Sequence, residues 1–128
     1  MIFVRKLGLS IIFILIAVAL YAGDAPRVVS TIPENGDMNV DPSLKEISVT
    51  FDRAMMDKSW SWSYEDANKF PEIAGEPYYA EKTRCVLPVR LEPDKEYVIW
   101  INTARFKNFK SASGIPAEPY RLAFKTWK

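Results

Sequence analysis

The residues best suited to contact a ligand are three aromatic side chains in the segment SWSWSY, residues 59–64. Trp60, Trp62 and Tyr64 alternate there with serines, so in an extended strand the three rings share one face. Such a face could stack on the apolar surfaces of sugar rings, or it could pack inside a core. Burying the rings removes about 150–250 Å2 of each from water, whereas burying three serines gains little and requires hydrogen-bond partners. We therefore predict a contribution to the core, with carbohydrate binding as the alternative.

A second candidate is the segment RFKNFK, residues 105–110, in which basic and aromatic residues are interleaved. Side chains of this kind can neutralise and stack on single-stranded nucleic acid. The overall charge opposes that ligand, because the formal net charge of +1 falls to about −1 without Arg5 and Lys6 of the N-terminal segment. We expect no nucleic acid partner. We expect instead a solvated loop whose phenylalanines anchor it on the domain, and which offers a protein partner a place to bind.

Oxygen-bearing side chains recur at every second position between residues 35 and 41, a spacing that calcium loops use. They are Asn35, Asp37, Asn39 and Asp41. The glycine and the distant glutamate that an EF-hand loop requires are not in the corresponding places. Turn chemistry explains all four residues, so we predict turns closed by these side chains and no metal site.

Residues for catalysis are scarce in this sequence. There is no histidine, which removes the Ser-His-Asp and Cys-His mechanisms and the commonest transition-metal ligand. The carboxylates that could form a glycosidase pair, at separations that the sequence does not fix, are Asp52, Asp57, Glu65 and Asp66. We expect an ion pair between Asp52 and Arg53, no catalytic residue and no cofactor.

The first 22 residues are typical of a secretory signal peptide. Two basic residues precede an apolar run over residues 7–22 that is slightly short for a comfortable membrane span. Cleavage after Ala19, with Ala17 at the −3 position, fits the small-residue rule better than cleavage after Ala22. We predict export. An uncleaved anchor is the alternative, and membrane contact is then made only through this segment.

The rest of the chain alternates as strands do and predicts an all-β domain. Runs rich in β formers or alternating in polarity cover residues 27–32, 45–51, 59–64, 83–89, 95–102 and 120–127. We expect about seven strands and at most one helical turn, over residues 54–60. The single cysteine, Cys85, alternates in phase with Leu87 and Val89, so we predict that its thiol lies in the core.

The sequence LEPDKEY, residues 91–97, has the layout of a tyrosine corner, in which the hydroxyl of Tyr97 would bond to the backbone of the preceding turn. The series that contains it resembles the SbsA-type Ig-like domain family, bacterial domains named after an S-layer protein. The matching positions are Pro26, Val28, Pro33, Gly36, Val40, Ile47, Val49, Phe51, Met55, Tyr97, Ile99, Gly114, Phe124 and Thr126. The resemblance covers about residues 26–127. The polar residue that the family places before its loop glycine has only Asn108 and Ser111 as nearby candidates.

The resemblance implies an Ig-like Greek-key β-sandwich that serves as a spacer, accessory or adhesion-like module of exported bacterial proteins, without catalytic residues. Copper-binding periplasmic proteins of the CopC type open in a similar way. They bind copper largely through histidine, so the similarity implies a related sandwich and not the metal.

We therefore predict a signal segment over residues 1–22 and one Ig-like sandwich over residues 26–127, exported to the periplasm or the cell exterior. We expect a non-catalytic structural or interaction module of the bacterial envelope, without cofactor, whose partner is an envelope protein or, in the alternative, a polysaccharide. The candidate contact residues are Trp60, Trp62, Tyr78, Tyr79, Arg105, Phe106, Lys107 and Phe109.

Overall fold

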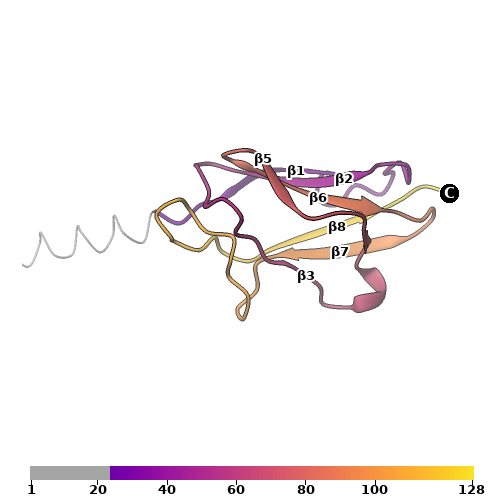
Figure 1. Ribbon diagram of the computed structural model, residues 1–128. Coiled ribbons are helices and arrows are strands. Elements are labelled where there is room, and N and C mark those ends of the chain that lie inside the picture. Colours follow the sequence, from indigo (N-terminus) through magenta and orange to yellow (C-terminus); the bar gives the residue numbers. More distant parts are fainter. Residues whose placement is uncertain (1–23) are drawn as a thin grey trace, which may run out of the picture.

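The computed structural model describes residues 24–128, which form a sandwich of two antiparallel sheets (Figure 1). These residues contain β1 (Val28–Ile32), β2 (Glu46–Phe51), β3 (Trp62–Ser63), the 3-10 turn η1 (Ala67–Lys69), β4 (Glu72–Ile73), β5 (Tyr78–Glu81), β6 (Arg84–Arg90), β7 (Glu96–Ile101) and β8 (Tyr120–Lys125). The predicted all-β sandwich is confirmed, with eight strands in place of about seven. The predicted signal segment lies outside the described residues. Between residues 24 and 128, no helix combines the length and apolar character needed to cross a membrane.

The larger sheet is organised around β6, which pairs with β2, and β2 pairs with β1. Two short strands share the other edge of β6. β5 pairs with its first residues, and β4 pairs with its last, where Ile73 lies opposite Val89. Pro71 and Pro77 immediately precede β4 and β5, and because proline has no N–H to donate, they limit pairing at this edge.

The smaller sheet has β7 at its centre, between β3 and β8. β7 and β8 pair along their whole length, from Glu96 opposite Lys125 to Ile101 opposite Tyr120. β3 pairs with β7 through only two residues. The prediction of a strand over residues 59–64 was therefore wrong in extent, and residues 54–60 form no helical turn.

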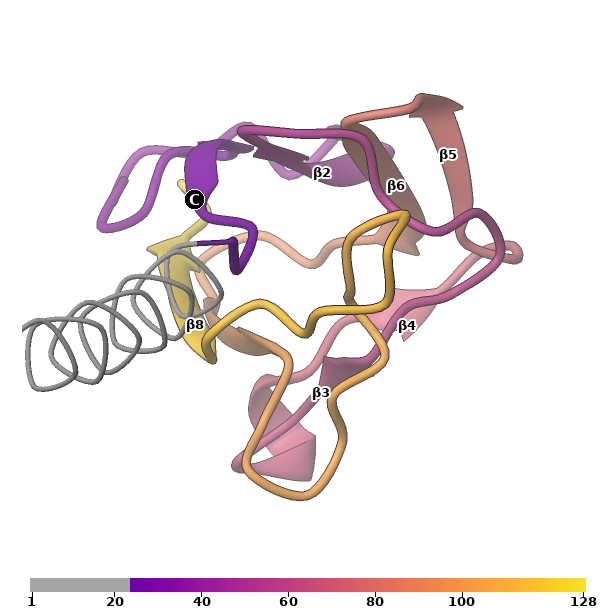
Figure 2. The ribbon, with the colours of Figure 1, turned by 90° about the vertical axis from the view of Figure 1, so that its left-hand side faces the viewer.

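The core lies between the sheets and follows the predicted alternation. Ile47, Val49 and Phe51 of β2 face it. So do Cys85, Leu87 and Val89 of β6, which confirms the prediction for the thiol. Figure 2 looks along the sandwich, with β2, β5 and β6 in one layer and β3 and β8 in the other.

The predicted tyrosine corner is present. The Tyr97 hydroxyl accepts a hydrogen bond from the backbone N–H of Glu92 at 2.8 Å. Thr126 reinforces the same turn, because its hydroxyl donates to the Glu92 carbonyl at 2.6 Å and accepts from the Lys95 N–H at 3.0 Å. These bonds join the turn before β7 to the end of β8.

The turn-rich segment between β1 and β2 covers the free edge of β8. Asn35 accepts the Ala123 N–H through its side chain, and Gly36, at a φ of +86° that favours glycine, donates to the Ala123 carbonyl. Asp37 and Asp41 accept backbone N–H groups two residues ahead. The prediction of turns closed by side chains is confirmed for Asp37 and Asp41. Asn35 instead bonds to β8.

Candidate binding groove

A groove of about 820 Å3 opens along the side of the sandwich where β3 and β4 are the edge strands. Its walls come from both sheets, because Leu87 of β6 and Ile73 of β4 face Trp62 and Ser63 of β3 across it. The loop after β7 closes one end. The lining residues are Trp60, Ser61, Trp62, Ser63, Tyr64, Phe70, Ile73, Pro77, Leu87, Thr103, Arg105 and Phe106.

The aromatic residues of SWSWSY form much of this lining and are not a closed core face. Trp60 and Trp62 are half-buried, and Tyr64 is 62% exposed. Ser61, in contrast, is only 8% exposed, and its hydroxyl accepts the Asn108 N–H. The prediction of three buried rings and three solvated serines was therefore wrong for Tyr64 and Ser61, because the paired part of the strand ends at Ser63.

The two tryptophans are nevertheless held in fixed positions by packing. Trp62 meets Phe109 edge to face, with ring centroids 5.2 Å apart, and Trp60 packs on Tyr79 at 6.3 Å. The indole N–H of Trp62 is buried and has no hydrogen-bond partner among residues 24–128. Rings held by packing present a preformed surface, since little rotamer freedom remains to be lost on binding.

The loop between β7 and β8 is shaped by Asn102, a residue that the sequence analysis missed. Its side chain is fully buried, donates to the carbonyls of Phe109 and Ala117, and accepts the Phe109 N–H, all within 2.8–2.9 Å. Its backbone N–H donates to Ser61, at a left-handed φ of 63°. Asn102 thus joins the start of the loop to Phe109 and Ala117 through its side chain, and to Ser61, just before β3, through its backbone. The only local signal is an asparagine at the end of a β run, a residue that tolerates this conformation.

The candidate contacts of RFKNFK divide between groove, solvent and core. Arg105 and Phe106 line the groove, and the guanidinium lies 5.5 Å from the ring centroid, within cation–π distance. Lys107 is exposed but does not line the groove. Phe109 is 0% exposed and packs on Phe51 and Trp62. The prediction that Phe109 contacts a partner at the surface was therefore wrong. Phe109 is the anchor that fixes the loop to the core.

Tyr78 and Tyr79 belong to β5 and do not line the groove. The Tyr78 hydroxyl donates to the Glu46 carboxylate, which raises the pKa of this exposed tyrosine. Tyr79 donates to the Ser59 carbonyl at 2.9 Å, and its burial raises its pKa. Of the eight candidate residues, the fold thus brings together Trp60, Trp62, Arg105 and Phe106.

The carboxylates considered for glycoside hydrolysis have separate local partners. Asp52 forms the predicted ion pair with Arg53 at 2.9 Å, which lowers the pKa of the carboxyl. Glu65 accepts hydrogen bonds from Arg121 and from the indole of Trp100, both at 2.8 Å, and its pKa is also lowered. Asp66 caps η1. Over residues 24–128 no group of three acidic or cysteine side chains is arranged to hold a metal ion.

The Cys85 thiol is chemically inert in this fold. Burial raises its pKa to about 12. Because the thiolate and not the thiol is the nucleophile, Cys85 offers no reactive group at neutral pH.

Two antiparallel sheets joined by a tyrosine corner define an Ig-like sandwich. A family model described as "Bacterial Ig-like domain" matches residues 22–126, and the chain belongs to this family. The predicted resemblance is confirmed, and the family indicates a surface or structural module of a bacterium. No curated protein and no solved structure gives a significant match.

Proposed function

We propose that this chain is an exported, non-catalytic Ig-like module of the bacterial cell envelope, and that it acts by binding a partner protein in the groove beside β3. The observation that carries the proposal is the exposure of apolar side chains there. Tyr64, Ile73 and Phe106 are each 45–62% exposed and line one concave surface with two half-buried tryptophans. Contiguous exposed apolar surface is typical of interaction sites.

The residues around the groove support binding and not catalysis. In the groove, the hydroxyl groups of Ser61 and Thr103 already accept backbone N–H groups of the neighbouring loop. The nearest carboxylate considered for chemistry, Glu65, is paired with Arg121. A hydrolase needs a general acid or base with a perturbed pKa facing its substrate, and the lowered pKa of Glu65 makes it a weak base.

Site-specific photocrosslinking in cells tests this proposal. The full chain carries a photoreactive phenylalanine analogue at Phe106 or Tyr64 in the groove, or at Val29 on β1. Val29 is a matched control, because it is 60% exposed but does not line the groove. We expect one discrete protein adduct from the two groove positions. No protein adduct from the groove, or the same adduct from Val29, would contradict the proposal.

Carbohydrate binding is the second candidate, favoured by the ring surfaces of Trp60, Trp62 and Tyr64 along one groove. Affinity electrophoresis of the full chain through gels containing envelope polysaccharide measures it. If sugars are the ligand, the wild-type chain is retarded, and the exposed Tyr64→Ala variant migrates faster in the same gel. Equal mobility of both in gels with and without polysaccharide would exclude this candidate.

A further inference from the structure

The backbone of β3 has an open hydrogen-bonding edge. The Asn102 N–H donates to the Ser61 carbonyl, and Trp62 lies opposite Ile101. In an antiparallel ladder, hydrogen-bonded and non-hydrogen-bonded pairs alternate, so the N–H and C=O of Trp62 point away from β7. β3 is the last strand of its sheet. These two groups therefore face the groove side with no strand beyond them.

The open edge continues on both sides of β3. Trp60 and Tyr64 stand two residues before and after Trp62, and neither has a backbone hydrogen bond within residues 24–128. Natural sheets protect such edges with charges, prolines or bulges. Residues 59–64 contain no charged residue and no proline, whereas prolines precede the edge strands β4 and β5. The β3 edge thus lacks these protections and is suited to pair with a further strand.

Apolar surface lies next to this edge, where the side chains of an added strand would go. Ile73 and Leu87 from the opposite sheet line the groove with Trp60 and Trp62. An extended peptide that adds to a sheet edge obtains affinity from main-chain hydrogen bonds and specificity from pockets for alternate side chains. Of the polar side chains here, Ser61 and Thr103 already accept backbone N–H groups of the neighbouring loop.

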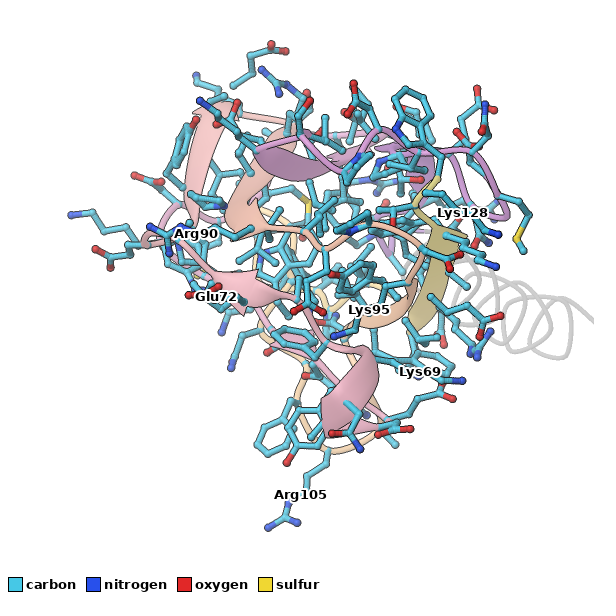
Figure 3. The ribbon with its side chains drawn as sticks, turned by 90° about the vertical axis from the view of Figure 1, so that its right-hand side faces the viewer. Lys69, Glu72, Arg90, Lys95, Arg105 and Lys128 are labelled. Carbon is cyan, nitrogen blue, oxygen red and sulfur yellow. The ribbon has the colours of Figure 1, made fainter. Side chains whose placement is uncertain are left out.

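The charge at the end of the groove selects among possible peptides. The segment 103–110 carries Arg105, Lys107 and Lys110 and no acidic residue. None of these three cations forms an ion pair with another residue of the described chain. Figure 3 shows Arg105 extending into solvent at the far end of the molecule, whereas Arg90 lies beside Glu72 and pairs with it. An acidic group on the ligand would complete the charge balance at Arg105.

We propose that the groove binds an extended peptide strand of alternating apolar residues with an acidic residue near one end, which adds to the edge of β3 and pairs its carboxylate with Arg105. The proposal rests on the proposed function and deepens it by naming the partner's chemistry. The ligand's backbone bonds to Trp62, and its alternate side chains enter the space between Trp60 and Leu87.

Selection from a phage library of random twelve-residue peptides, with the full chain as bait, tests this site. We expect enriched peptides with apolar residues at every second position and an aspartate or glutamate near one end. Arg105→Glu should weaken their binding at least tenfold and strengthen that of the same peptides with lysine in place of the acid. Lys45→Glu is the control, because it reverses the charge at an exposed residue that does not line the groove. It should change the binding of neither the acidic peptides nor their lysine versions.

Backbone N-methylation of a selected synthetic peptide tests strand addition directly. Methyl groups on the N–H groups of one edge should abolish binding, and methyl groups on the other edge should leave it nearly unchanged, because only one edge of an added strand pairs with β3. Equal binding of both methylated peptides, no enrichment, or no charge preference at Arg105 overturns the inference. Discrete groove adducts in the photocrosslinking experiment would still support the proposed function in that case. Retardation by polysaccharide together with no peptide enrichment would overturn the inference in favour of a sugar ligand.

Discussion

Two segments of this chain alternate large and small or polar residues in a similar way, and they end in opposite environments. In β7, Tyr97, Ile99 and Ile101 are all at most 1% exposed. In residues 59–64, the corresponding rings are half-buried or exposed. β7 has a strand on each side, whereas residues 59–64 pair on one side through two residues only. Alternation thus shows which side chains share a face, while the number of neighbouring strands decides whether that face is closed.

The largest effect should come from truncating the closed face. Ile99→Ala removes a fully buried side chain between β3 and β8 and should lower the free energy of unfolding by about 4 kcal/mol, through lost apolar burial and the cavity left behind. Tyr64→Ala on the open segment should change it by less than about 0.5 kcal/mol, as exposed positions usually do. Urea unfolding measures both. A similar loss for the two variants would mean that residues 59–64 are as closed as β7.

The next effect concerns the junction between the two segments. Asn102→Ala leaves the Phe109 N–H and the Ala117 carbonyl without a partner, and it places alanine at a positive φ. We expect a loss of about 3 kcal/mol. Asn108→Ala is the matched control: this asparagine is exposed and bonds only through its backbone, so its change should stay within about 0.5 kcal/mol. If the Asn102→Ala variant and the wild type unfold at the same temperature, water replaces the hydrogen bonds of the Asn102 side-chain amide.

A smaller effect is expected at the corner that begins β7. Tyr97→Phe keeps the buried ring and removes the acceptor of the Glu92 N–H, which should cost about 1–1.5 kcal/mol. Tyr120→Phe serves as control, because no hydrogen bond of its hydroxyl is found within residues 24–128. The two unfolding midpoints in urea should differ while the slopes remain equal. Coinciding midpoints would contradict a structural role for the hydroxyl.

The smallest effect is electrostatic and concerns Glu65, the residue that follows the open segment. The pKa of Glu65 is depressed by hydrogen bonds from Arg121 and Trp100. A depressed folded-state pKa stabilises the protein above the unfolded value, about 4.5, and this contribution disappears as the pH falls through the folded value. Glu65→Gln should therefore be slightly less stable than wild type at pH 7 and equal to it near pH 2. Glu118→Gln is the matched control, at an exposed residue that forms no ion pair among residues 24–128.

The sequence predicted correctly those features that depend on residues only a few positions apart. The phase of Cys85 with Leu87 and Val89, the Tyr97 corner and the Asx turns all follow from alternation or turn chemistry within a few residues. The exposure of Tyr64 could not be predicted, because it depends on the absence of a strand beyond β3. Asn102 was missed for a related reason, because its partners, Phe109 and Ala117, are 7 and 15 residues away. In the sequence, a residue with left-handed backbone cannot be distinguished from any other residue at the end of a strand.

The loop phenylalanines illustrate the same limit. Phe106 and Phe109 are three residues apart in one loop, yet one is 50% and the other 0% exposed. Composition predicts that such a loop needs an apolar anchor, but only the bonds of Asn102 to Phe109 decide which ring is inserted. Of the eight candidate contacts, four line the groove and four do not.

The burial of Cys85 has a practical consequence for spectroscopy on this domain. With its pKa raised to about 12, the thiol stays protonated at the pH of ordinary labelling reactions. Maleimide and nitroxide reagents would thus leave the native cysteine unmodified as long as the chain stays folded. A single cysteine introduced at Val29 or Phe106 could carry a spin label or fluorophore without first removing the natural one.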